Sequence, residues 1–284
     1  DPVPLTQGVP FGAGQLPAAA AVRLRDEAGA TYPVQTAVLA TWAADLAWTK
    51  WLLVDAQLPR RPAALFLEYG DGVAAVPPAG VVAVTDTADA VTVDTGVLRL
   101  TLRRGQADFL GQIEIRTPAG WRHALAAGNA AELYVCDSSG LDSSSLAPAP
   151  APRIVVEDAG PLRASVCVRG LHADASGRRA FPYVLRLHLY AGSGQIRCFH
   201  TFVFDQDPDV VKLAAVGWRL PLALGEVAAA GFGGDGRAHL LDRPAGEQRA
   251  GGRADWQRAR WLQLDDRHYE VRTAAAGQPE LVRH

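Results

Sequence analysis

Basic and titratable side chains alternate along the segment Phe181–Phe204, and the pattern predicts a β-hairpin. The turn of this hairpin would be the stretch Tyr190-Ala-Gly-Ser-Gly-Gln195. If the two ends of that stretch pair, the facing residues follow, because side chains alternate between the two faces of a strand. One face then holds His188 opposite Arg197 and Arg186 opposite Phe199, and the other holds Leu187 opposite Cys198 and Leu185 opposite His200. The first face is polar and basic, and the second is apolar.

A second alternating segment, Pro161–Gly170, places Arg163, Ser165, Cys167 and Arg169 on one side of a predicted strand. If this strand neighbours the hairpin in one sheet, the arginines of both segments form one basic surface. Guanidinium groups bind carboxylates with two parallel hydrogen bonds, so such a surface suits acidic sugars. The predicted substrate-binding residues on it are Arg163, Arg169, Arg186 and Arg197. The alternative is a solvated outer face, or a face packed on another domain.

Two residues of the hairpin have the chemistry needed to cleave an acidic sugar by β-elimination. That reaction needs a neutralised uronate carboxylate, a base for the proton α to it, and an acid for the leaving oxygen. His188 and Tyr190 are the predicted catalytic residues, with His188 as the base. His200 shares its face with Cys198 and phenylalanines, so it is predicted to be a core histidine.

Three tryptophans, Trp42, Trp48 and Trp51, lie within ten positions of one another. Trp48 and Trp51 have opposite parity within one predicted strand, so they cannot share a face. Packing in a core is the favoured interpretation, because buried aromatics dominate the cores of β domains. Stacking on a sugar ring is the alternative, with Trp48 and Lys50 as the predicted substrate contacts and Lys50 placed to meet a uronate carboxylate.

Metal and redox chemistry receive little support from the sequence. Asp205, Asp207 and Asp209 resemble the start of a calcium loop, but the later glycine and glutamate of that motif are missing, so a strand-ending turn is expected. We predict no cofactor, with calcium as the one alternative. Cys136, Cys167 and Cys198 form no Cys-x-x-Cys pair, so structural burial is expected and one disulfide with a leftover thiol is the alternative.

The elements that would position these residues are β-strands throughout. Alternating or β-branched runs separated by Gly, Pro, Asp and Ser recur along the whole chain, which predicts an all-β protein. Two segments interrupt the pattern, Gly70–Gly80 and Ser138–Pro152. The first predicts a domain boundary, giving domains at 1–80 and 81–284. The second predicts a Ser/Ala/Pro-rich surface loop, 138–152, within the larger domain.

Composition excludes several classes of partner. The chain has 284 residues, 49% of them hydrophobic, and a net charge of −2. It lacks the basic excess that favours nucleic acid, and it lacks an apolar run of the roughly 20 residues that span a membrane. No methionine occurs and the chain opens at Asp1-Pro2, so we expect a mature, secreted or periplasmic product whose signal has been removed.

Several spaced motifs resemble the exo-acting rhamnogalacturonan lyase family. The longest are Gly8–Leu16, Pro33–Trp42 and Trp48–Asp55. Shorter ones are Phe66–Gly70, Thr92–Arg99, Glu157–Ala164, Leu189–Gly192 and Arg197–Asp205. The resemblance extends over most of the chain to about Leu224.

The resemblance implies a RIFT-type β-barrel to about Gly80, followed by a larger β-sandwich of galactose-mutarotase-like supersandwich character. It also implies a C-terminal α/α toroid, which carries much of the sugar-binding cleft in that family. The chain departs from the family at Trp42-Ala-Ala-Asp-Leu-Ala-Trp48, where Trp-Pro-Asp-Gly-Ser is usual, and no helical toroid follows.

Three functions remain open. The first is the β-domain portion of a secreted lyase-like protein that binds or cleaves acidic polysaccharide of pectic, rhamnogalacturonan type. The second is a non-catalytic carbohydrate-binding module. The third is an extracellular structural protein that uses the two β domains for self-association. The expected partners are thus an acidic poly- or oligosaccharide, with an α/α domain in a longer protein or further copies of the chain.

Overall fold

The computed structural model describes residues 2–42, 47–59, 61–147 and 150–223, and beyond them the backbone of five further strands. Every regular element in these parts is a β-strand, so the all-β prediction is confirmed. No helix that is long and apolar enough to cross a membrane occurs there. The chain forms two compact units, Asp1–Leu222 and Ala223–His284.

Two small sheets form the RIFT-type barrel at the start of the first unit. One has the strand order β1 (Val3–Pro10), β5 (Thr49–Leu58), β4 (Gln35–Thr41), and the other β3 (Thr31–Tyr32), β2 (Val22–Asp26), β6 (Leu65–Tyr69). Strand β5 contributes alternate side chains to the core of the barrel. Leu52, Val54 and Ala56 point inward and are buried, whereas Trp51, Leu53, Asp55 and Gln57 alternate with them on the outer face.

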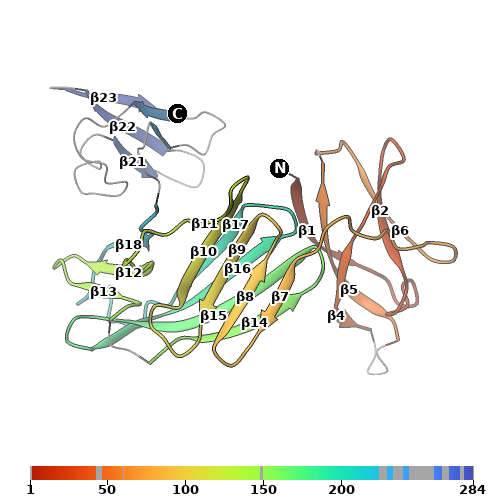
Figure 1. Cartoon of the computed structure of the whole chain (residues 1–284), viewed down its shortest axis with the longest axis horizontal. Coiled ribbons are helices and arrows are strands. Elements are labelled where there is room, and N and C mark those ends of the chain that lie inside the picture. The colour runs from red at the N-terminus through yellow and green to blue at the C-terminus, as the bar shows by residue number, and fades with distance from the viewer. Residues whose placement is uncertain are drawn as a thin grey trace. The chain divides into compact units, whose positions relative to one another are not determined.

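The β-sandwich follows a connection, residues 70–82, that contains no strand. Its first sheet has the order β11 (Gly120–His123), β10 (Leu110–Thr117), β9 (Leu98–Arg103), β8 (Ala90–Asp94), β7 (Ala83–Asp86). Its second has the order β17 (Ile196–Phe202), β16 (Arg179–Tyr190), β15 (Arg163–Ala173), β13 (Asp142–Ser144), β12 (Glu132–Asp137), β18 (Leu213–Arg219), with β14 (Arg153–Ala159) also paired to β15. The first sheet lies over the second (Figure 1).

The core of the sandwich lies between these two sheets. Most of its members come from alternate positions of β8, β9, β12, β15 and β16, so these strands keep their polar residues on the outer face. Examples of the buried side chains are Val93, Leu100, Leu133, Val166 and Leu187. The polar side chains of the sandwich therefore lie on the outer faces of its sheets, although Ser165 and Cys167 on the outer face of β15 are buried.

The predicted hairpin has the predicted register. His188 pairs with Arg197, Arg186 with Phe199, Leu187 with Cys198 and Leu185 with His200. Strand β15 is the neighbour of this hairpin, with Ser165 opposite His188 and Cys167 opposite Arg186. The short, glycine-rich turn sets the register of the hairpin. Any shift of the register by one residue is also disfavoured, because it would turn the apolar side chains outward.

Two expectations about local structure were wrong. The segment 138–152 is more than a surface loop, because it contains strand β13, which joins β12 to β15 in the sheet. The tryptophans Trp42, Trp48 and Trp51 are 46%, 37% and 42% exposed, so none of them lies in the barrel core. The inward positions of β5 hold smaller aliphatic residues instead.

The second unit contains two separate antiparallel sheets. One joins β19 (Ala229–Phe232) to β20 (His239–Asp242). The other has the order β21 (Ala259–Gln263), β22 (Tyr269–Ala275), β23 (Gln278–Arg283). The domain bounds 1–80 and 81–284 stay a prediction.

Candidate functional site

The outer face of strands β14, β15, β16 and β17 carries a row of cations that we call the basic face. Cross-strand pairing places Arg153 beside Arg169, Cys167 beside Arg186 and Ser165 beside His188. Strand β17 adds Phe199 beside Arg186 and Arg197 beside His188. The basic face consists of Arg153, Arg169, Arg186, His188, Arg197 and Phe199. The predicted assembly of the hairpin and the Pro161–Gly170 strand into one surface is therefore present.

Arg163 lies at the end of this face but is buried, with its side chain only 5% exposed. Its Nε donates to Asp55 Oδ1 at 2.7 Å and its Nη2 to Asp158 Oδ2 at 2.8 Å. Its Nη1 lies 2.8 Å from His188 Nδ1. All three arms of the guanidinium are thus engaged within the protein, so Arg163 connects the barrel to the sandwich instead of facing solvent.

Gln35 forms the second connection between barrel and sandwich. Its Oε1 accepts hydrogen bonds from the backbone N–H groups of Leu162 and Arg163 at 2.9 and 2.8 Å. Its Nε2 donates to the Arg163 carbonyl and to the Asp158 carboxylate, each at 3.0 Å. Gly160 lies against this amide so closely that a Cβ there would sit 2.2 Å from the amide carbon of Gln35. The end of the basic face is therefore fixed against the barrel.

The bond from Arg163 sets the protonation of His188. A guanidinium can only donate, so His188 Nδ1 must accept, and the neutral ring carries its proton on Nε2. Burial lowers the pKa of His188, and the neighbouring Arg163 charge lowers it further. In this state the ring offers an N–H donor at Nε2, whereas the lone pair that a base needs is occupied at Nδ1.

Tyr190 stands opposite Arg163 across strands β15 and β16. It is 5% exposed, so its side chain is buried. The structure thus brings the two predicted catalytic residues to the same end of the basic face. It gives them different access to solvent, since His188 is only partly buried.

The cations of the basic face differ in how far they are already neutralised. Arg186 forms a two-pronged ion pair with Glu157, with Nε 2.9 Å from Oε2 and Nη2 3.1 Å from Oε1. Arg197 stacks over the Phe199 ring at 4.9 Å. Arg153 and Arg169 are both exposed, and no carboxylate of the described residues forms an ion pair with either of them or with Arg197. These three arginines are the ones available to an anionic ligand.

The predicted contacts Trp48 and Lys50 lie on the barrel. The Lys50 ammonium sits 4.7 Å above the Trp42 ring, and Trp48 pairs with Pro17. Among the described residues, no hydrogen bond, ion pair or ring contact joins Trp48 or Lys50 to the basic face. The structure therefore does not bring them together with the hairpin residues.

Three residues of this region were not among the predicted site residues, although Phe199 was placed on the polar face of the hairpin and Trp51 in the tryptophan cluster. Arg153 begins an alternating strand, a pattern that could have placed it beside Arg169. Phe199 is 46% exposed and adjoins both His188 and Arg197. Trp51 lies on the same face of β5 as Asp55, about 13 Å along the strand, so register favours it over Trp48 as the tryptophan nearer the basic face.

The predicted turn at Asp205, Asp207 and Asp209 uses its carboxylates locally. Asp205 Oδ1 accepts from the Phe181 N–H at 3.0 Å, and Asp207 Oδ1 accepts from the Asp209 N–H at 2.9 Å. Within the described ranges no group of three or more His, Cys, Asp or Glu side chains is arranged to hold a metal ion. The cysteines are free thiols, with Cys167 buried, Cys136 half-buried and Cys198 exposed.

Two family models match the chain. The PcRGLX-like N-terminal RIFT barrel domain matches residues 2–57, and the PcRGLX-like protein central beta sandwich domain matches residues 82–228. A curated relative, the uncharacterized protein YetA of Bacillus subtilis (strain 168), is 25% identical over 230 residues. That match covers 78% of this chain and 25% of YetA, so the chain spans about a quarter of the relative's length.

Two solved structures from Enterococcus faecalis are similar at 10% identity. An α-mannosidase from strain V583 has a TM-score of 0.38, covering 71% of this chain and 28% of that chain. A protein in glycosyl hydrolase family 38 has a TM-score of 0.46, covering 100% of this chain and 38% of that chain. The family itself rests on the two matched domains, which coincide with the barrel and the sandwich. The chain belongs to the PcRGLX-like family, the rhamnogalacturonan lyase-like group whose motifs its sequence contains.

Proposed function

We propose that this chain is the β-domain portion of a secreted or periplasmic lyase-like protein and that its basic face binds acidic polysaccharide of pectic, rhamnogalacturonan type. The observation that supports this most directly is the gathering of arginines on one sheet face of a chain whose net charge is −2. Cations concentrated against the overall charge indicate an anionic ligand.

The spacing of the available cations suits a polymer better than a single anion. Neighbouring strands are about 4.8 Å apart, and successive residues on one face of a strand are about 6.8 Å apart. Arg153, Arg169 and Arg197 therefore lie at several points across the sheet, so carboxylates on different sugar units can be neutralised together. Phe199 offers an apolar ring for the C–H face of a pyranose beside Arg197.

His188 fits this ligand as a hydrogen-bond donor. Its Nε2–H can donate to a uronate carboxylate or a hydroxyl, while Arg163 keeps the ring oriented. Catalysis of β-elimination would need His188 to accept a proton, which requires Arg163 to release Nδ1 or the ring to turn over. The basic face thus supports binding more strongly than it supports a base at His188.

Calorimetric titration with oligogalacturonides tests the binding. Arg169→Gln and Arg197→Gln should each weaken affinity about five- to tenfold at low salt, as expected for loss of one charge-assisted contact. Arg61→Gln is the matched control, because Arg61 is an exposed barrel cation. Affinity should fall as salt rises. If the control and the two variants bind equally well, the basic face is not the site.

Catalysis is tested separately by incubating the chain with rhamnogalacturonan and following the ultraviolet absorbance of unsaturated uronate. If the chain is catalytic, His188→Ala should abolish the absorbance increase. Unchanged activity in that variant would exclude His188 as base, and binding without any product would favour a non-catalytic module. Light scattering over a range of concentrations checks the self-association alternative, which predicts a mass that rises with concentration.

A further inference from the structure

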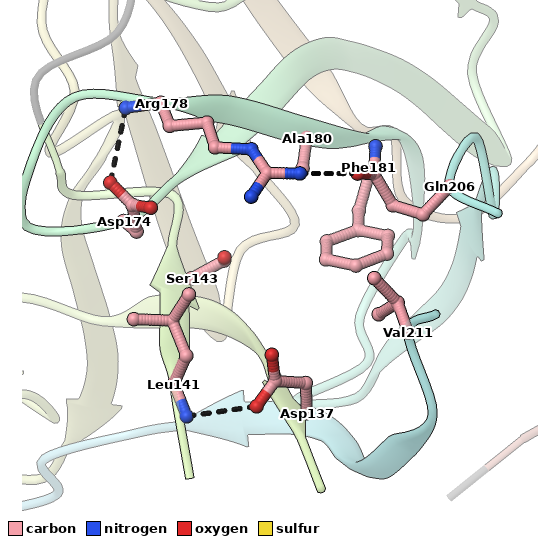
Figure 2. A pocket seen from close by; sticks show the side chains of 9 residues that line it. All are labelled: Asp137, Leu141, Ser143, Asp174, Arg178, Ala180, Phe181, Gln206 and Val211. Atoms are coloured by element: carbon pink, nitrogen blue, oxygen red, sulfur yellow. Dashed lines mark hydrogen bonds between the residues drawn. The ribbon is translucent and has the colours of Figure 1, made fainter. Parts of the chain in front are cut away.

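A small hollow (Figure 2) lies beside strands β12 and β13, at the end of the sandwich away from the barrel in Figure 1. It opens between strands β12 and β13, the turn that joins β15 to β16, and the segment after β17. The residues that line it are Asp137, Leu141, Ser143, Asp174, Arg178, Ala180, Phe181, Gln206 and Val211. Arg169, the basic-face residue of β15 nearest to this end, lies five residues before Asp174, so about 17 Å of strand separates the hollow from the basic face.

Asp137 and Asp174 are held by the same arrangement of hydrogen bonds. Asp137 Oδ1 accepts from the N–H and hydroxyl of Ser139 and from the Leu141 N–H, at 2.9, 2.6 and 3.0 Å. Asp174 Oδ1 accepts from the N–H and hydroxyl of Ser176 and from the Arg178 N–H, at 2.9, 2.6 and 3.0 Å. Each carboxylate keeps its second oxygen on the side of the hollow (Figure 2).

These hydrogen bonds keep both carboxylates ionised. The bonds from the Ser139 hydroxyl and the Leu141 N–H lower the pKa of Asp137. The Ser176 hydroxyl has the same effect on the pKa of Asp174. Ionised carboxylates are strong acceptors, so the two Oδ2 atoms are available to hydroxyl donors.

Ser143 adds a hydroxyl to the wall of the hollow. The residue is 5% exposed, and its hydroxyl points into the hollow (Figure 2). Among the residues drawn there, no hydrogen bond joins this Oγ to another side chain. The hydroxyl is therefore open to the hollow, where a polar group of a ligand can bond to it.

The opposite wall combines a donor with an aromatic ring. Arg178 extends over the hollow and donates from Nη2 to Gln206 Oε1 at 2.9 Å, which leaves its other N–H groups for a ligand. The Phe181 ring forms the apolar side. Phe181 has a φ of +52°, a strained value for a side-chain-bearing residue, and its carbonyl and N–H are bonded to His172 and Asp205. The ring is thus held in place at the expense of backbone strain.

The size of the hollow limits what can enter. It measures about 30 Å³, and roughly 10–15 Å³ accommodates one water molecule, so about two groups of that size fit. Two adjacent hydroxyls of a sugar have this size. Their protons can be accepted by the two carboxylates and Ser143, their oxygens can accept from Arg178, and the C–H face of the ring can rest on Phe181.

We infer that this hollow binds the edge of a neutral sugar through two adjacent hydroxyl groups. The two carboxylates outnumber the single guanidinium, so a uronate is repelled. The guanidinium beside them also opposes a divalent cation, which would otherwise suit the two carboxylates. This ligand is therefore chemically different from the acidic polymer proposed for the basic face, and the two sites can be tested apart.

Calorimetry and ligand-observed NMR with three probes, D-galactose, D-galacturonate and calcium chloride, test the inference on the full chain. Galactose should bind and galacturonate should bind at least tenfold more weakly. Ser143→Ala should weaken galactose binding about fivefold, and Asp137→Asn about tenfold, as for loss of a neutral and of a charge-assisted hydrogen bond. Asn keeps the Oδ1 acceptor that holds the turn, so Asp137→Asn should remain folded.

Asp89→Asn, at an exposed carboxylate in the turn between β7 and β8, is the matched control and should bind galactose normally. Arg169→Gln should also leave galactose binding unchanged, which separates this site from the basic face. The inference is overturned if galactose does not bind, if its binding is the same in Ser143→Ala and Asp137→Asn, or if calcium alone binds and is lost in Asp137→Asn.

Discussion

The guanidinium of Arg163 is enclosed by partners from three parts of the chain, Asp55, Asp158 and His188. Asp55 lies 108 residues earlier in the sequence than Arg163. Breaking one side of a buried ion pair is costly, because the remaining charge stays out of water without compensation. The main role of Arg163 is therefore to hold the barrel and the sandwich together.

Arg163→Met should lower the free energy of unfolding by about 3–5 kcal/mol, since it leaves Asp55 buried and unpaired. Urea unfolding followed by tryptophan fluorescence measures this. Adding Asp55→Asn to Arg163→Met should restore part of the lost free energy of unfolding, because it removes the buried carboxylate that has lost its ion-pair partner. Arg61→Met, at an exposed arginine, should change stability by less than about 0.5 kcal/mol. Equal effects at the two arginines would contradict the enclosed geometry.

Some of the candidate site could be predicted from sequence because strand alternation is a local rule. The pairing of His188 with Arg197 follows from a short glycine-rich turn and an apolar opposite face. The burial of Arg163 could not be predicted in this way. Its partner Asp55 is on the barrel, and no local pattern indicates that the two segments meet.

At the scale of elements, strands β15, β16, β17 and β18 contribute an aromatic cluster inside the sandwich. His172, Tyr183, His200 and Trp218 lie within it, with the His172 and His200 rings 6.1 Å apart and the His200 and Trp218 rings 6.0 Å apart. The prediction that His200 is a core histidine is confirmed by these contacts. Neither histidine has a recorded hydrogen-bond partner for its Nε2 within the described residues.

This cluster should make the protein sensitive to acid. Burial lowers the pKa of His200 to about 4, and burial also lowers the pKa of His172. Between about pH 6.5 and pH 4 the unfolded chain binds protons that the folded chain does not, so stability falls as pH falls. His200 alone should account for about 3 kcal/mol of that loss by pH 4.

Urea unfolding at a series of pH values tests this, with His200→Phe as the variant. The variant should show a shallower loss of stability between pH 6.5 and pH 4. His123→Phe is the control, because the side chain of His123 is 62% exposed. If His200→Phe and the unsubstituted chain lose stability equally, protonation of the cluster does not drive the acid sensitivity.

The sequence did not predict strand β13, because its residue types are those of turns. Strand β13 is Asp142-Ser-Ser144, and serine and aspartate are typical of turns. It forms because it bridges β12 and β15, a tertiary contact that outweighs local preference. The tryptophans were assigned to the core by residue type alone. Trp51 instead lies against Gly8 on the outer face of the barrel.

At the scale of the whole molecule, the barrel and the sandwich meet through buried polar contacts. Gln35 and Gln57 from the barrel bond to the backbone of the sandwich at Leu162 and Arg163, and Asp55 pairs with the Arg163 side chain. The all-β class and the two architectures could be anticipated from strand patterns and family motifs. This junction could not, because its residues are far apart in sequence and individually ordinary.

Gln35→Glu tests the junction with almost no change in shape. The carboxylate cannot donate to the Arg163 carbonyl, and it faces the Asp158 carboxylate with like charge. We expect a loss of about 2–4 kcal/mol in stability, measured by urea unfolding. Gln7→Glu is the control, since Gln7 is an exposed residue of β1. An equal, small effect in both variants would mean that the junction contributes little.

The side chain of Gln35 behaves as an extra peptide group, with one oxygen accepting from two backbone N–H groups and one nitrogen donating back. An uncharged group of this kind is indifferent to ionic strength, unlike the exposed arginines of the basic face. The orientation of the barrel on the sandwich should therefore stay constant in salt that releases an acidic polymer. A pair of fluorophores, one on the barrel and one on the sandwich, should report the same separation before and after salt releases the polymer.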